Sequence, residues 1–246
     1  MRVAYWAPRV ARGEWGGRMS GEGTGSVVKD IRARRFVLFD LDGTVTDTLD
    51  GIVRTARSVL RDYGLPEERL VDAPKLVGPP FPQAFSMVFG LSEEDAREVT
   101  RRYRDIYDNL GPAAWPAFQG IGQLARDLRA AGRVVATASS KRQAMVGHCL
   151  ADNGLDDAFD LVVGRVSDGG ETKAQTIARA LDALGAEPSQ AVMVGDRYFD
   201  VDGARANDVP CVGVTYGHTA PRSELEQAGA VAIAGSVDEL RRILLG

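Results

Sequence analysis

Cysteine, histidine and long apolar runs are scarce in this chain. Its 246 residues include two cysteines, Cys149 and Cys211, and two histidines. The cysteines lie far apart without metal-type spacing, so we expect buried free thiols in a reducing cytoplasm rather than a zinc site or a disulfide framework. No apolar run approaches the ~18 residues that a membrane helix needs, and the N-terminus lacks the apolar core of a signal peptide. We therefore expect a cytoplasmic protein that does not bind membranes.

Neither sign of charge dominates the composition. The 30 Lys and Arg residues nearly balance the 34 Asp and Glu residues, which gives a formal net charge of -4. No basic stripe with interleaved aromatic residues occurs, so we do not expect nucleic-acid binding. Hydrophobic residues make up 44% of the chain, enough to bury a substantial core. The sequence leaves open whether the protein is a monomer or a homodimer.

Residues 1–34 differ in composition from the rest of the chain. They contain the stretch RGEWGGRMSGEGTGS, which is rich in Gly, Arg and Ser and has no clear periodicity. Such segments rarely bury enough apolar surface to fold. We predict a poorly ordered N-terminal extension over these residues.

From residue 35 onward, short apolar segments alternate with helical patterns. The strand candidates are rich in Val, as strands buried on both faces should be. They cover residues 36–39, 133–138, 159–163, 191–194 and 211–214. Strands that alternate with helices indicate a parallel sheet covered by helices on both faces. We therefore predict a Rossmann-like α/β core built from residues 35–48 and 117–246.

Residues 49–116 interrupt this alternation. They hold no buried-strand pattern, and apolar residues recur at helical spacing from Ile52 to Tyr63 and again from Ala96 to Leu110. An insertion of this length is too long for a simple crossover. We predict an all-helical cap domain over 49–116 that hinges over the sheet. Gly78 and Pro79, in a rigid turn within it, are expected to face the substrate.

Polar side chains gather where the predicted strands end, which is where an open parallel sheet binds its ligands. They are Asp40, Asp42, Ser139, Ser140, Lys141, Lys173, Asp196 and Asp200. Crowded carboxylates repel one another and need a cation, and oxygen ligands without His or Cys suit Mg²⁺. Hydroxyl and lysine groups would bind the oxygens of a phosphoryl group. With Mg²⁺ bound, Asp40 could act as a nucleophile and Asp42 as an acid, with Leu41 only spacing them.

In their order, these groups resemble the four motifs of the haloacid dehalogenase (HAD) superfamily. The matching features are DLDGT at residues 40–44, a strand ending in Ser139, the later Lys173 and GDRYFD at residues 195–200. The resemblance runs from about residue 35 to the end, and the helical insertion is similar to the mobile cap of that superfamily. It implies an HAD-like fold with an aspartyl-phosphate formed on Asp40.

The resemblance also implies a role for each remaining residue. Asp42 would be the general acid and base and would offer its backbone carbonyl to Mg²⁺, which Asp196 would bind directly and Asp200 through water. Ser139 would hold a phosphate oxygen, and Lys173 would bridge the nucleophile and the phosphate. The residues expected to bind substrate or phosphate are Gly43, Thr44, Gly78, Pro79, Ser139, Ser140 and Lys173.

Within the superfamily, VGPPFPQAF and GVTYGHTAPRSELEQAGA resemble the branch of phosphoglycolate phosphatases and 5′-nucleotidases. Carbon–halide dehalogenases lack the second acid, so Asp42 argues against the reaction that names the superfamily. The resemblance implies a Mg²⁺-dependent phosphatase for a small phosphorylated metabolite, such as phosphoglycolate or a nucleoside 5′-monophosphate. A phosphomutase similar to β-phosphoglucomutase and a non-catalytic phosphoryl-binding regulatory module are the alternatives.

Two assignments stay open at the level of sequence. Thr137 and Ser139 share a face in a strand of period two, so either hydroxyl could hold the phosphate, although the count from Gly132 favours Ser139. Lys141 could replace Lys173. We expect Lys141 instead to begin the next helix, near the site but out of contact with the reacting groups.

Overall fold

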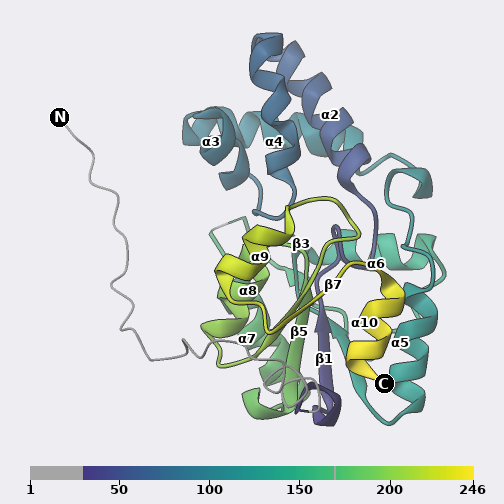
Figure 1. Cartoon of the computed structure of the whole chain (residues 1–246). Coiled ribbons are helices and arrows are strands. Elements are labelled where there is room, and N and C mark those ends of the chain that lie inside the picture. Colours follow the sequence, from purple (N-terminus) through teal and green to yellow (C-terminus); the bar gives the residue numbers. More distant parts are fainter. Residues whose placement is uncertain (1–29, 169) are drawn as a thin grey trace.

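The computed structural model describes residues 30–168 and 170–246 (Figure 1). Within these ranges, the main sheet has five strands in the order β2-β1-β5-β6-β7, and each neighbouring pair is parallel. The strands are β1 (Phe36–Phe39), β2 (Val134–Thr137), β5 (Ala191–Gly195), β6 (Cys211–Val214) and β7 (Ala232–Ala234). Together with the flanking helices, this sheet confirms the predicted α/β class.

Side-chain alternation along β1 divides the core into two layers. Val37 and Phe39 pack into one apolar cluster with α5 (Ile121–Ala130), α6 (Gln143–Asp152) and α10 (Val237–Leu244). Phe36 and Leu38 face the other cluster, which includes residues of α7 (Lys173–Leu184), α8 (Tyr198–Arg205) and α9 (Arg222–Ala228). Because successive side chains of a strand point to opposite faces, the buried β1 needs a helical layer on each side.

A second, two-stranded parallel sheet is formed by β3 (Ser139–Arg142) and β4 (Gly164–Arg165). The sequence predicts a strand at 159–163, but the structure has only a bridge between Leu161 and Ala136 there. Side chains replace part of the ladder in that segment, because the hydroxyl of Thr137 both donates to the carbonyl of Val163 and accepts from its amide. The regular strand therefore begins later, at β4.

The inserted helices stand beyond the end of the sheet where β1 finishes (Figure 1). They are α2 (Leu49–Asp62), α3 (Gln83–Phe89) and α4 (Glu93–Tyr107), with 3₁₀ segments at Glu67–Leu76 and Pro112–Ala114. Aromatic rings fill their interior, among them Phe85 and Tyr103 with centroids 6.2 Å apart. Among the described residues, no helix combines the length and the apolar character that crossing a bilayer requires.

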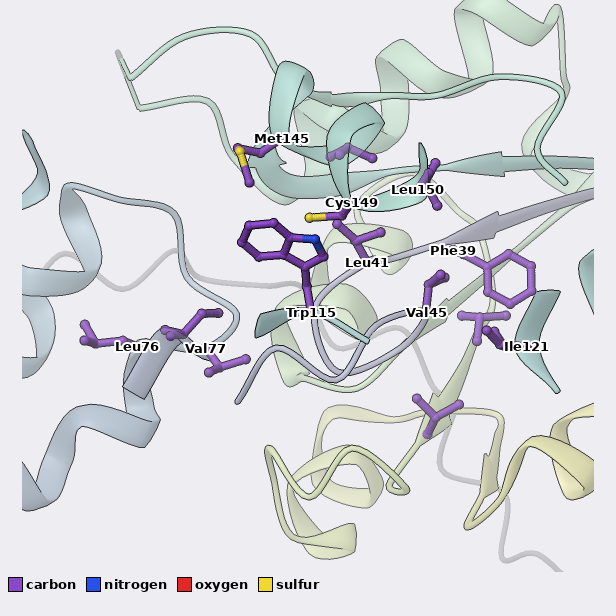
Figure 2. Close-up of a cluster of buried hydrophobic side chains, with 14 of the residues drawn as sticks. Phe39, Leu41, Val45, Leu76, Val77, Trp115, Ile121, Met145, Cys149 and Leu150 are labelled. Carbon is purple, nitrogen blue, oxygen red and sulfur yellow. The ribbon is translucent and has the colours of Figure 1, made fainter. Parts of the chain in front are cut away.

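Trp115, which lies between the 3₁₀ segment Pro112–Ala114 and α5, is fully buried (Figure 2). Figure 2 shows the indole beside Met145, Cys149 and Leu41, and its Nε1 donates a hydrogen bond of 2.8 Å to Asp152. The aromatic ring thus contributes apolar burial while its one polar atom keeps a partner. Both cysteines of the chain are buried free thiols.

The N-terminal segment predicted to be poorly ordered, residues 1–34, overlaps the described part of the chain. Residues 1–29 lie outside the described part of the chain, whereas residues 30–33 are helical. Ile31 is fully buried, and Arg133 donates a hydrogen bond to its carbonyl. Arg34 donates to the carbonyl of Ala191 at 2.9 Å. The boundary predicted at residue 34 therefore needs correction, because one apolar side chain and these guanidinium contacts fix residues 30–34 to the core.

Candidate active site

Three carboxylates meet at the carboxyl ends of β1 and β5. Asp40 directly follows β1, Asp196 follows β5, and the two strands lie side by side with Phe39 paired to Val194. Asp200 lies in the first turn of α8. All three are buried, and each contributes an oxygen to a group whose atoms lie within 4.8 Å of one another.

The ammonium group of Lys173 binds two members of this carboxylate cluster. Its Nζ lies 2.8 Å from Oδ1 of Asp40 and 2.7 Å from Oδ1 of Asp200. Lys173 is the first residue of α7, and the helix start is fixed by a capping box between Thr172 and Gln175. Burial alone would lower the pKa of Lys173, but the neighbouring Asp200 and Asp40 carboxylates outweigh it and raise that pKa. Lys173 is therefore a buried, charged group.

One ammonium group does not balance three buried carboxylates. Burial raises the pKa of Asp196 well above its ordinary value, and the charges of Asp200 and Asp40 add to this effect. Burial likewise raises the pKa of Asp200 to about 6. The raised pKa values of Asp196 and Asp200 both indicate that the site favours an added positive charge, either a proton or a cation.

The donor set of this cluster fits Mg²⁺. Every candidate ligand atom is a carboxylate oxygen, the donor type that Mg²⁺ prefers. Among the described residues, the buried Oδ1 of Asp40 accepts no hydrogen bond, so its contact with Lys173 is an ion pair without hydrogen-bond alignment. Asp40, Asp196 and Asp200 are therefore the side chains that could hold the ion. Asp42 was predicted to offer its backbone carbonyl to the ion, and its carboxylate is not part of this cluster.

Short polar residues hold Asp196 in place. Thr44 donates a hydrogen bond of 3.4 Å to its Oδ1, and Thr219 donates to its Oδ2. Gly43 has a φ of +75°, and a Cβ atom there would lie 2.1 Å from the same Oδ2, so glycine is required by both conformation and space. Thr44 and Gly43 were predicted to bind phosphate, and in the structure they contact this carboxylate. Thr219 is missed by the sequence analysis because a threonine in a loop carries no pattern.

Asp42 has different surroundings from Asp40. Its carboxylate accepts hydrogen bonds of 2.9 and 3.3 Å from Nζ of Lys141, which also donates to the hydroxyl of Tyr107 at 3.2 Å. Burial would lower the pKa of Lys141, but Asp42 and Tyr107 outweigh it and raise that pKa. The prediction that Lys141 begins a helix out of contact with the reacting groups is wrong. The residue lies in β3, whose polar sequence SSKR gives no strand signal.

The two candidate phosphate-binding hydroxyls differ in their partners. Thr137 donates to the carbonyl of Val163 at 3.0 Å and accepts from its amide at 2.8 Å. A hydroxyl carries one hydrogen, so that of Thr137 is used within the fold. The oxygen of Ser139 accepts from the amide of Lys141 at 3.2 Å, which leaves its hydrogen for another acceptor. The geometry favours Ser139 over Thr137 as a phosphate-binding residue.

A cavity of about 70 Å³ lies between the inserted helices and the core. Asp42, Ser140 and Lys141 line it from the core, and Gly78 and Pro79 line it from the opposite side. Further lining comes from Ile52, Leu76, Pro80, Phe81, Tyr103, Arg104, Tyr107, Asp108, Arg142, Met145 and Arg165. A reaction at Asp40 would therefore have a partly open cavity beside Asp42 for the rest of a substrate.

Known proteins with similar sequences include a kinase and a nucleotidase, and one family model matches most of the chain. A family model described as "Haloacid dehalogenase-like hydrolase" matches residues 37–214. The tyrosine-protein kinase PtkA of Mycobacterium tuberculosis is 38% identical over 212 residues, covering 85% of this chain and 72% of that protein. A 5′-nucleotidase of Pseudomonas aeruginosa is 34% identical over 182 residues, covering 74% and 82%.

The solved structures that resemble this chain include a predicted phosphatase. The crystal structure of a predicted phosphatase from Clostridium acetobutylicum has a TM-score of 0.80 and 36% identity. The match covers 85% of this chain and 97% of that one.

Proposed function

This chain belongs to the haloacid dehalogenase-like hydrolase family as a phosphoric monoester hydrolase, and we propose that it hydrolyses a small phosphate monoester with Mg²⁺ through an aspartyl-phosphate on Asp40. One observation carries the proposal. Two acids separated by one residue lie beside different lysines, Asp40 beside Lys173 and Asp42 beside Lys141. Titratable pairs in unlike environments are suited to different tasks in one reaction.

In the first step, an oxygen of Asp40 attacks phosphorus while the bond from phosphorus to the leaving oxygen breaks. Asp42 gives a proton to that oxygen, and the product is an alcohol. The hydroxyl of Ser139 and the ammonium group of Lys173 bind the phosphoryl oxygens and stabilise their negative charge. Mg²⁺ held by Asp40, Asp196 and Asp200 would supply the remaining positive charge at the phosphoryl group.

In the second step, water attacks the phosphorus of the aspartyl-phosphate. Asp42 is now a carboxylate and takes the proton of the water, while the bond between phosphorus and Asp40 breaks. Inorganic phosphate leaves, and both acids return to their starting states. The inserted helices would exclude bulk water during the first step and open for release.

The substrate remains a proposal at the level of a small phosphorylated metabolite, with phosphoglycolate and nucleoside 5′-monophosphates as candidates named by relatives. A phosphomutase would return the phosphate to a sugar without releasing it. The name of the mycobacterial relative adds transfer from a nucleotide to tyrosine as a third outcome. One assay separates these outcomes, since only a phosphatase releases inorganic phosphate from many simple monoesters in the absence of a nucleotide.

The test is a screen of phosphate monoesters, including p-nitrophenyl phosphate, with Mg²⁺ and with EDTA. The wild type should release phosphate only with the cation. Asp40→Asn should lower kcat by at least about 10³-fold while the protein stays folded, because the nucleophile is lost. Asp50→Asn, an exposed position on α2, is the matched control and should keep wild-type rates. Near-full activity of Asp40→Asn would overturn the proposal.

A further inference from the structure

The wall of the cavity beyond Asp42 is rich in guanidinium groups. Arg165 of β4 and Arg142 of β3 are paired neighbours in the small sheet, and Arg104 reaches the cavity from α4. The lining contains these arginines and Lys141 as cations, against the carboxylates of Asp42 and Asp108. Among the described residues, the cavity lining therefore holds four cationic side chains and two carboxylates.

Arg165 is the most buried of these arginines, with its side chain 2% exposed. Its Nε donates to the carbonyl of Ser140 at 3.2 Å, and its Nη2 lies 3.2 Å from a carboxylate oxygen of Asp168. Its Nη1 is buried and, within residues 30–168 and 170–246, has no hydrogen-bond partner. A buried charged donor without an acceptor is costly, and Arg165 lines the cavity, so an anion bound there would offset part of that cost.

The nearby carboxylates are already engaged by the other arginines. Asp168 accepts two hydrogen bonds from Arg104, at 2.6 and 2.8 Å, which leaves it a weaker partner for Arg165. Asp108 accepts from Arg142 at 2.6 Å. Neither contact supplies the acceptor that Nη1 of Arg165 lacks.

We propose that Arg165, assisted by Arg142, forms a second anion site that binds a carboxylate or phosphate on the leaving group of the substrate. The inference rests on the proposed function, which places the leaving oxygen at Asp42. Asp42 and Arg165 line the same cavity, so the leaving group extends from one toward the other. The guanidinium fork matches the oxygens of either anion, and a cavity of about 70 Å³ has room for a small leaving group.

The test compares monoesters that differ only in this anion. One pair is 3-phosphoglycerate and glycerol 3-phosphate, and the other is propane-1,3-diol bisphosphate and 3-hydroxypropyl phosphate. The specificity ratio is kcat/KM for the compound with the second anion divided by kcat/KM for the compound that has a hydroxyl group in its place. A charge-assisted hydrogen bond should make this ratio on the order of 10 to 100 in the wild type for at least one pair. The pair that shows it identifies the anion as carboxylate or phosphate.

Variants at Arg165 test the assignment to that residue. Arg165→Met should lower the ratio by about tenfold or more, because the anion loses its partner. Arg165→Lys preserves the charge of the wall and should also lower the ratio, because an ammonium group cannot place a donor where Nη1 lies. Arg179→Met is the matched control. Arg179 donates to the carbonyl of Gly164, next to Arg165, but does not line the cavity, so its ratio should equal that of the wild type.

The outcomes separate this inference from the proposed function. If simple monoesters are hydrolysed but the wild type shows a ratio near one for both pairs, the anion site is refuted and the phosphatase stands. An unchanged ratio in a folded Arg165→Met or Arg165→Lys protein refutes the role of Arg165 in the same way. If no monoester releases phosphate, including p-nitrophenyl phosphate, the proposed function fails and the anion site fails with it.

Discussion

Removal of divalent cations should expose the charge imbalance at Asp40, Asp196 and Asp200 as a loss of stability with rising pH. In the metal-free protein, Lys173 is the cation in contact with this buried group among the described residues. Asp200 has a pKa of about 6, raised chiefly by burial and further by Asp40, with Lys173 acting in the opposite direction. The pKa of Asp196 is raised in the same direction. The free energy of unfolding should therefore depend on the protonation of these carboxyl groups.

The sign follows from linkage between protonation and folding. A carboxyl group with a higher pKa in the folded state contributes stability below its ordinary pKa of 3.8, and this contribution is lost as the pH rises through about 6. A shift of this size in Asp200 corresponds to about 3 kcal/mol at neutral pH. Mg²⁺ binds the ionised carboxylates, so a saturating concentration should restore stability in the upper part of this window.

Urea unfolding in EDTA and in saturating Mg²⁺, repeated across this pH window, measures the effect. At each pH, the free energy of unfolding in EDTA is subtracted from that in Mg²⁺, so the titration of distant groups cancels. This difference should grow by about 3 kcal/mol as the pH rises. Asp202→Asn, on the same helix but half exposed, should reproduce the wild-type difference, whereas Asp196→Asn should reduce it. Parallel curves with and without Mg²⁺ would refute the reasoning, because the buried carboxylates would then not bind the cation.

Five further variants test the surroundings of the site and the core. Lys141→Met should lower kcat/KM on the order of 10- to 100-fold by releasing Asp42, with partial recovery in Lys141→Arg, and a folded variant with unchanged kinetics would contradict this. Thr137→Val should reduce the free energy of unfolding by about 1–3 kcal/mol with little change in kcat/KM. Ser139→Ala should lower kcat/KM with little change in the free energy of unfolding. Loss of activity in a folded Thr137→Val protein would show that Thr137, and not Ser139, binds the phosphate. Ile31→Ala should cost about 2–5 kcal/mol in urea unfolding, and a cost near zero would show that this residue does not belong to the core.

The sheet was predictable because burial on both faces is a property of each segment alone. Short Val-rich runs identify β1, β2, β5 and β6 whatever their neighbours are. The three residues of β7 are too few for a pattern and only partly buried, so they acquire strand structure from pairing with β6. The strand order likewise depends on pairing between distant segments, which the periodicity of a single segment does not encode.

The polar groups at the strand ends were predictable for the same reason, since Asp40 and Asp196 follow clear strands. The hydrogen bonds that these polar groups make were harder to predict. The bond from Lys141 to Asp42 depends on β3, a polar strand without hydrophobic alternation, and the bond from Thr219 to Asp196 comes from a loop. Side-chain direction in such segments is set by the fold around them, so pattern analysis identified the residue types without their partners.

Leu41 does more than separate Asp40 from Asp42, because it also sets the direction of the chain between them. Leu41, expected only to space them, is fully buried, and its carbonyl accepts hydrogen bonds of 2.9 Å from the amides of both Val45 and Thr46. The chain therefore turns at Leu41 instead of continuing as a strand, where residues two apart would share a face. This turn leaves Asp40 in the buried cluster with Lys173 and directs Asp42 to the cavity and Lys141. A nucleophile and an acid can therefore lie within one short segment, because the two carboxyl groups lie beside different lysines.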